Sequence, residues 1–146
     1  MTMPSDAEVV VERRIAAPPE RVFAYFTDRD RWLAWMGADA VIEPRPGGVF
    51  RMDVMGDGEH AAGRFVEVVP DRRIVFTWGW ETPGSAVPPG ASLVEIDLIP
   101  AGAGETLVRL RHRGLPAAAL PDHDHGWTHF LGRLVAVVEP GPRTPR

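Results

Sequence analysis

The sequence predicts a single α+β domain in which one long C-terminal helix lies against an antiparallel sheet. Between about residues 39 and 113, runs of alternating apolar and polar residues are separated by Gly and Pro, a pattern typical of successive strands and tight turns. From residue 122 to 139 the spacing changes to that of an amphipathic helix. A chain of 146 residues with 45% hydrophobic content suffices for one such core and is short for two.

The C-terminal helix is predicted over Asp122 to Glu139, in the segment PDHDHGWTHFLGRLVAVVE. One side carries an unbroken apolar stripe at helical spacing, made of Trp127, Phe130, Leu131, Leu134, Val135 and Val138. The opposite side is small or polar and includes His129, Gly132, Arg133 and Ala136. Asp122 is the expected N-cap, and Gly141 with Pro142 closes the far end. Such a stripe needs a broad apolar surface, which the strands supply.

The chain before the sheet is predicted to form one strand and two short helices. Glu8 to Ile15 is rich in β-branched residues and reads as a strand that Pro18 stops. Because Pro is tolerated in a first helical turn, a helix is expected from Pro19 to Thr27. A second helix follows, with Asp28 or Asp30 as its cap. Its buried side consists of Trp32, Leu33, Trp35 and Met36.

Six further strands are predicted, each with one apolar and one solvated face. They are Ala40 to Glu43, Val49 to Met55, His60 to Val69, Arg73 to Glu81, Leu93 to Ile99 and Glu105 to Arg113. Short Gly/Pro turns between neighbours favour antiparallel pairing, and Thr82 to Gly90 is expected to be a mobile loop. The domain is placed at residues 8–139, with flexible termini at 1–7 and 140–146.

Composition excludes several classes of function. The formal charge of −4 and the absence of a basic block argue against nucleic acid as a partner. The chain has no cysteine, so it has neither disulfides nor a thiol nucleophile. No apolar run has the length of a signal peptide or of a membrane span, and we expect a cytoplasmic bacterial protein.

Six segments, in this order, resemble the START-like (SRPBCC) superfamily. They are APPERVFAYFTD, DRWLAWMG, PGGVFRMDV, GRFVEVVPDRRIVFTW, TLVRLRHRGL and HGWTHFLGRL. The resemblance covers Val9 to Val138 and is most specific to the branch named after the C-terminal domain of the activator of the ninety-kilodalton heat-shock protein ATPase. It implies a helix-grip fold, in which a curved antiparallel sheet of about seven strands wraps around the C-terminal helix and leaves a cavity between them. Members of the superfamily include carriers of hydrophobic ligands, polyketide cyclases and aromatases.

The resemblance places a ligand cavity between the inward strand faces and the helix stripe. The residues expected to line it are Trp35 at the rim, Phe50, Met52, Phe76, Trp78, Trp80, Ile96, His112, Trp127, Phe130 and Leu131. A mostly apolar, aromatic wall with a few polar groups suits a small hydrophobic or aromatic ligand. The same alternation also describes a filled core, so this alternative stays open for each residue.

Candidate catalytic and metal-binding residues are few. His112 is expected on the inward side of its strand. There it could act as a general base or hydrogen-bond a ligand oxygen, or it could be a structural histidine whose hydrogen bonds are satisfied by backbone or water. His125 and His129 have the spacing of two metal ligands, but HGWTH lacks a Glu and both lie off the apolar stripe, so no metal is predicted. The Asp and His residues of the first turn are taken as caps and surface charge. No serine with a histidine partner and no phosphate-binding loop is recognised, and no cofactor is predicted.

Three functions remain. The leading hypothesis is binding of a hydrophobic ligand. The alternative is an enzyme of the cyclase/aromatase or hydrolase type, with His112, Glu67 or Arg64 moving protons in the same cavity. The third is a regulatory module that binds a protein partner through the exposed sheet face. A homodimer is compatible with a domain of this size, although no pattern requires one.

Overall fold

The computed structural model describes residues 8–139 and has the predicted α+β fold. The predicted termini at 1–7 and 140–146 lie outside the described residues. In chain order the elements are β1 (Glu8–Ile15), α1 (Pro19–Thr27), α2 (Arg29–Leu33), β2 (Asp39–Ile42), β3 (Val49–Asp53), β4 (His60–Val69), β5 (Arg73–Trp78), β6 (Ser92–Pro100), β7 (Thr106–Arg113), a 3-10 turn η1 (Ala117–Ala119) and α3 (Leu120–Val138). Among these residues no helix is both long and apolar enough to cross a membrane.

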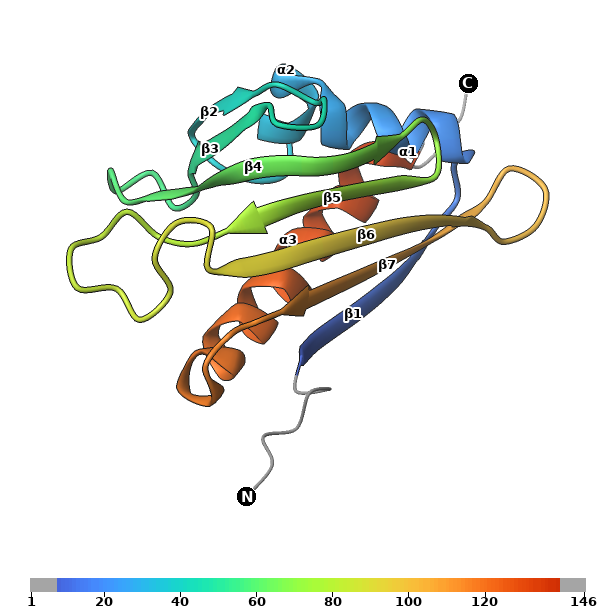
Figure 1. Cartoon of the computed structure of the whole chain (residues 1–146). Helices are drawn as coiled ribbons and strands as arrows, with labels where there is room; N and C mark the ends of the chain where they lie inside the picture. Colours follow the sequence, from blue (N-terminus) through green and yellow to red (C-terminus); the bar gives the residue numbers. More distant parts are fainter. Residues whose placement is uncertain (1–7, 140–146) are drawn as a thin grey trace.

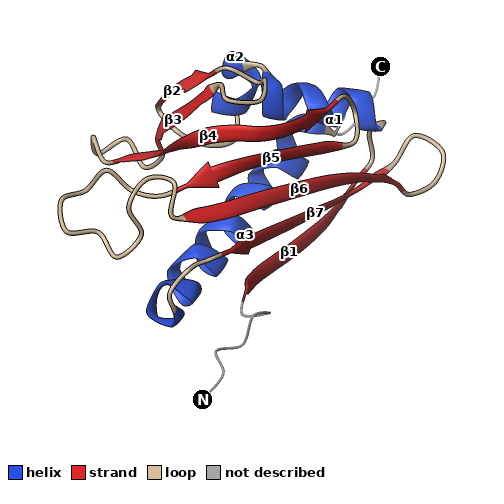
Figure 2. Cartoon of the chain, viewed as in Figure 1, coloured by secondary structure: helices blue, strands red, loops and turns tan. Residues whose placement is uncertain are grey.

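All seven strands form one antiparallel sheet in the order β1-β7-β6-β5-β4-β3-β2. The first strand in the chain thus pairs with the last, from Glu8 opposite Arg113 to Ile15 opposite Thr106. The register shifts between Phe65 and Glu67 of β4, and such a bulge increases the local twist. The sheet curves around α3, which crosses its inner face (Figures 1 and 2). The helix-grip architecture is confirmed.

Helix α3 packs its predicted stripe against the sheet. Trp127, Leu131, Leu134 and Val138 are buried, and Phe130 and Val135 are partly buried against the same core. The prediction was wrong about the start of the helix. It begins at Leu120, its N-cap is Ala119 with no side-chain cap, and Asp122 lies inside the first turn. Pro121 lies in the first turn of the helix and does not precede it, because Pro is compatible with a first helical turn.

The two short helices close one end of the core with aromatic side chains. Asp28 caps α2 as predicted, since its carboxylate accepts a hydrogen bond from the Arg31 backbone N–H at 3.0 Å. Trp32 and Trp35 stack with ring centroids 5.7 Å apart, and the Trp32 ring also lies 5.3 Å from that of Phe50. These rings fill the space between α2 and the middle of the sheet.

Two predicted strands end early for local reasons. β3 stops at Asp53 because its carboxylate accepts the backbone N–H of Gly56 at 2.9 Å, which begins the turn. β5 stops at Trp78 because Gly79 passes against the loop that follows, where an added Cβ would lie 1.7 Å from the Pro88 carbonyl oxygen. Trp80 then returns to the sheet through a single bridge to Ala61.

The loop over residues 82–90 is irregular, as predicted, and is anchored at its middle. Val87 is buried in the core, and its carbonyl oxygen accepts the backbone N–H of Trp80 at 2.6 Å. This contact holds the end of β5 against the loop.

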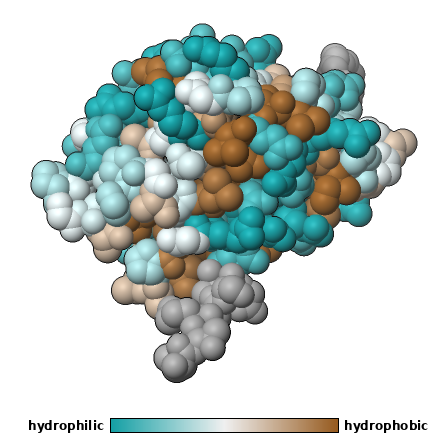
Figure 3. All heavy atoms as spheres, in the orientation of Figure 1, coloured by the Kyte–Doolittle hydropathy of each residue, from teal (hydrophilic) through white to brown (hydrophobic). Residues whose placement is uncertain are grey.

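The outer face of the sheet mixes hydrophilic and hydrophobic residues (Figure 3). Its hydrophilic residues include ion pairs, such as that of Arg73 with Asp97. Glu95 of β6 lies beneath Arg73 and Arg113, and its side chain is only 4% exposed. Burial alone would raise the pKa of Glu95, but the hydrogen bonds from Arg73 and Arg113 outweigh it and hold the pKa below its ordinary value. The buried Glu95 carboxylate therefore links the arginines of two strands, Arg73 of β5 and Arg113 of β7, on this face.

Candidate functional site

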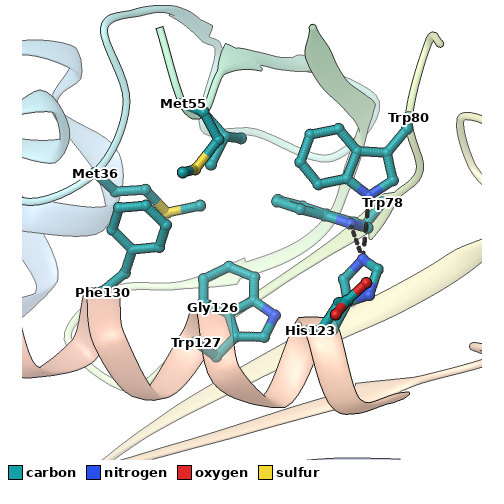
Figure 4. Close-up of a pocket in the computed structure, with 10 residues that line it drawn as sticks. Met36, Met55, Trp78, Trp80, His123, Gly126, Trp127 and Phe130 are labelled. Carbon is teal, nitrogen blue, oxygen red and sulfur yellow. Dashed lines mark hydrogen bonds between the residues drawn. The ribbon is translucent and has the colours of Figure 1, made fainter. Parts of the chain in front are cut away.

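One apolar pocket lies between the first half of α3 and the ends of β3 and β5 (Figure 4). Its volume is about 270 Å³. We call it the indole pocket, because three tryptophan rings stand around it. It is lined by Met36, Val54, Met55, Trp78, Trp80, Asp122, His123, Gly126, Trp127 and Phe130.

The indole rings are positioned by both layers of the fold. Trp78 ends β5 on its inward face, and its ring lies 5.4 Å from that of Trp80 and 5.3 Å from that of Trp127. Trp127 comes from the buried stripe of α3. One residue, Gly79, separates Trp78 from Trp80, so both side chains point to the inner side of the sheet even though the regular strand has ended. Sheet and helix thus each supply a wall.

His123 links these walls through hydrogen bonds. Its Nε2 accepts the indole N–H of Trp78 at 3.3 Å and that of Trp80 at 3.1 Å. Its Nδ1 lies 2.8 Å from the carbonyl oxygen of Ala119, one helical turn earlier. Since a carbonyl only accepts, Nδ1 carries the proton and the ring is neutral.

His112 lies directly behind the pocket and is fully buried. Its Nδ1 accepts the indole N–H of Trp127 at 3.0 Å, so the proton is on Nε2, 2.8 Å from the hydroxyl oxygen of Ser92. That hydroxyl in turn donates to the Trp78 carbonyl at 2.7 Å. Burial, with a smaller contribution from nearby His123, lowers the pKa of His112 to about 3. The imidazole is therefore a neutral structural link.

The expectation that no serine pairs with a histidine was wrong, because β6 and β7 bring Ser92 beside His112. The pair nevertheless has the wrong polarity for nucleophilic catalysis. The Ser92 proton is directed at a carbonyl, and the histidine donates to the serine where a general base would accept from it. Both side chains are sealed from solvent. The arrangement stabilises the wall and does not activate a hydroxyl.

The structure divides the predicted site residues into two groups. Four of them line the indole pocket: Trp78, Trp80, Trp127 and Phe130. The others lie in the packed core or behind the pocket wall and do not line it: Trp35, Phe50, Met52, Phe76, Ile96, His112 and Leu131. Phe50 and Phe76 stack on each other with centroids 4.4 Å apart, which leaves no space between these strands for a ligand.

Glu67 and Arg64 cannot move protons in the pocket. Both are exposed residues of β4 on the far side of the sheet from α3, where Glu67 accepts a hydrogen bond from Arg73 at 3.0 Å. The Arg64 guanidinium donates to the Gly47 carbonyl at 3.2 Å. Alternation along β4 turns the buried Phe65 inward and Arg64 outward, and the bulge between Phe65 and Glu67 brings Glu67 to the outer face as well.

His123 is the functional-site residue that the sequence reasoning missed. It was assigned to a surface cluster of Asp and His in the first turn of the helix. However, it lies four residues before Trp127, so it continues the buried stripe by one turn. His125 and His129 are exposed, and among residues 8–139 no group of three or more His, Asp or Glu is arranged to hold a metal ion.

Comparison with known proteins agrees with this fold. The sequence pattern of the family described as "Activator of Hsp90 ATPase homolog 1-like protein" (AHSA1) matches residues 16–139. The human protein "Activator of 90 kDa heat shock protein ATPase homolog 1" is 27% identical over 123 residues, which are 84% of this chain and 34% of the human protein. The chain thus spans about a third of the length of the curated relatives it matches.

Solved structures share both the fold and part of the sequence. The AHSA1-like protein RHE_CH02687 from Rhizobium etli is 45% identical, with a TM-score of 0.67 over 100% of this chain and 95% of that one. DynU16, a protein in the dynemicin biosynthetic locus, is 28% identical, with a TM-score of 0.75 over 89% of this chain and 46% of that one. With a family match over most of its length, the chain belongs to the Activator of Hsp90 ATPase homolog 1-like family, the branch of the START-like superfamily that its motifs resemble.

Proposed function

We propose that the chain binds a small hydrophobic or aromatic ligand in the indole pocket. The observation that carries the proposal is an apolar space left open beside an otherwise tightly packed core, with walls of three indole rings. Ligand pockets are concave and mostly apolar, with a small number of polar groups that fix orientation. His123 and the two indole N–H groups bonded to it are such polar groups.

The size of the pocket bounds the ligand. Its volume of about 270 Å³ is larger than an apolar cavity of ~150 Å³, which is known to hold a benzene molecule. A ligand with two fused rings therefore suits it better than one with a single ring or a long lipid chain. Aromatic rings on the ligand would also stack on the tryptophan faces.

Gly126 allows a sharp test, because it lines the pocket and an added Cβ there would meet nothing within 4 Å. Gly126→Leu should fill the space without disturbing the packed core. Gly132→Leu is the matched control, since Gly132 lies on the exposed side of the same helix and is equally unobstructed. Both changes add the same side chain to α3 and remove a helix glycine.

The measurement is native mass spectrometry of the purified proteins against their denatured masses, followed by calorimetric titration with 2-isopropenylnaphthalene. We expect a bound mass or measurable affinity in the wild type and in Gly132→Leu, and a loss of at least tenfold in Gly126→Leu. Equal binding by the two leucine variants would place the ligand elsewhere. The absence of any binding up to the solubility limit of the probe would refute the proposal.

An enzymatic role in the same pocket has less support. Of the described residues that line it, only Asp122 and His123 carry acidic or basic side chains, and both nitrogens of His123 are already engaged. A cyclase, aromatase or hydrolase would need a group free to exchange a proton with its substrate. DynU16 is in a biosynthetic locus, which keeps a reaction among the alternatives.

A regulatory role toward a protein partner draws on the curated relatives, whose names describe activation of a heat-shock ATPase. The outer sheet face mixes charge with isolated apolar residues such as Val10 and Val66, which are 48% and 50% exposed. It does not single out a docking site, so this role ranks below ligand binding. That the chain forms a homodimer also stays a prediction.

A further inference from the structure

At the indole pocket two indole N–H donors converge on one acceptor atom. The N–H groups of Trp78 and Trp80 are both directed at Nε2 of His123 (Figure 4). Because Nδ1 of that ring donates to the Ala119 carbonyl, Nε2 offers a single in-plane lone pair. The two N···N distances are 3.3 Å from Trp78 and 3.1 Å from Trp80, so neither donor has this lone pair to itself. Two donors therefore share one acceptor.

The other indole N–H groups do not have this property. Trp127 donates to Nδ1 of His112 and Trp35 to the carbonyl of Tyr25, each at 3.0 Å. The Trp32 N–H has no partner among the described residues, but its ring is fully buried among aromatic side chains away from the pocket. A surplus donor thus borders the pocket only at the Trp78 and Trp80 pair.

The charges around the pocket restrict the charge that its ligand can carry. Its described lining contains no Lys or Arg, and its one charged residue is Asp122. Asp122 already complements the positive end of the α3 dipole, since it lies in the first turn. A carboxylate ligand would give up its hydration without gaining an opposite charge, which is costly.

Resting on the proposed function, we propose that the indole pocket selects uncharged aromatic molecules that carry a hydrogen-bond acceptor oxygen, such as an aryl ketone or aldehyde. The oxygen takes the N–H of Trp80, which is partly exposed, while the N–H of the buried Trp78 keeps the His123 lone pair. Two donors then meet two acceptors. The site favours ligands with an acceptor oxygen over hydrocarbons of the same shape, because the oxygen gives the Trp80 N–H an acceptor that it does not share with Trp78.

Three probes of one shape test this selection. 2-Acetylnaphthalene carries the acceptor, 2-isopropenylnaphthalene replaces its oxygen by CH2, and 2-naphthoate is the anion. Since one neutral hydrogen bond contributes about 0.5–1.5 kcal/mol net, the ketone should bind roughly two- to tenfold more tightly than the hydrocarbon. The anion should bind more weakly than the ketone.

Substitution of the donor should abolish the preference. In Trp80→Phe the remaining Trp78 N–H has the His123 lone pair to itself, so the ratio of ketone to hydrocarbon affinity should fall to about one. Trp32→Phe is the matched control, because it removes an indole N–H that lies in the core, and its ratio should stay at the wild-type value. Ratios are compared because either change could alter absolute affinity.

The indole region of a 1H–15N correlation spectrum gives an independent readout. The chain has five tryptophans, so five resonances are expected, and single Trp→Phe variants assign them. The ketone should move the Trp80 N–H downfield, whereas the hydrocarbon should not. Equal affinity for the two neutral probes in the wild type, or an undiminished ratio in Trp80→Phe, would overturn this inference while leaving ligand binding intact. Failure of every probe to bind would instead refute the proposed function.

Discussion

Mild acid should destabilise the fold through His112. The native protein holds this imidazole neutral, with both nitrogens bonded inside the core. Its pKa is about 3, against an ordinary value of 6.5, which the unfolded chain regains. Between these two pKa values the unfolded state therefore binds a proton at His112 that the native state does not bind. Stability that is fully present above pH 6.5 is lost as the pH falls toward 3.

The size of the effect follows from the two pKa values. A difference of about 3.5 units corresponds to a limiting loss of about 5 kcal/mol at very low pH. Between pH 7 and pH 5 the same relation gives about 2 kcal/mol. Three carboxylates whose native pKa values are lowered, Asp39, Glu81 and Glu95, have ordinary values of 3.8 to 4.5, so they add little above pH 5. This window isolates histidine.

The assay is urea unfolding at pH 7 and pH 5 for the wild type and for His112→Gln. A glutamine amide keeps one acceptor for Trp127 and one donor for Ser92 but does not titrate. The free energy of unfolding of the wild type should fall by about 2 kcal/mol more than that of the variant. If both proteins lose the same stability over this interval, His112 is not the buried neutral group described above.

Four further substitutions test the packing of the fold by urea unfolding. Ser92→Ala should cost about 2–4 kcal/mol because it leaves a buried carbonyl and the His112 Nε2–H without partners; a cost under ~0.5 kcal/mol would contradict the network. Gly79→Ala should cost more than about 3 kcal/mol, since its Cβ would fall 1.7 Å from a carbonyl oxygen. Gly132→Ala should instead stabilise the helix by about 0.5–1 kcal/mol, because an added Cβ there meets nothing within 4 Å. If both variants gained stability, or both lost it, this account of the two glycines would be refuted. Glu95→Gln should cost about 3 kcal/mol because it takes from Arg113 the carboxylate it pairs with and leaves Arg73 with only Glu67 and Asp97. A neutral outcome would show that the outer face does not depend on this carboxylate.

Most of the fold was predictable because its signals are local. Alternation of apolar and polar residues, together with Pro and Gly at the turns, placed β1, α1 and β4 at their observed bounds. The strand ends that were missed depend on contacts with residues outside the strand, which alternation within the strand does not report. β5 stops where Gly79 meets the backbone at Pro88, and nothing in residues 73–81 encodes that contact.

The site was only partly predictable because alternation reports which face a residue occupies and not what fills the space above it. Phe76 and Trp78 share the inward face of β5, yet Phe76 is packed against Phe50 while Trp78 borders the pocket. The difference arises from where α2 ends and how α3 crosses the sheet. His123 could have been predicted from the sequence, since it extends the Trp127 stripe by one turn. It was missed because the stripe was defined by apolar residues and histidine is polar.

The closeness of the three pocket indoles gives the molecule a built-in optical signal. Chromophores held 5.3 and 5.4 Å apart at fixed angles couple electronically, so their combined near-ultraviolet circular dichroism depends on their mutual orientation. Trp32 and Trp35 are nearly parallel, with an interplanar angle of 10°, whereas Trp78 and Trp80 are nearly perpendicular at 87°. A small rotation of the partly exposed Trp80 should therefore change the spectrum while the core pair stays constant. Binding of the proposed ligand should therefore be detectable in the spectrum of the unlabelled protein.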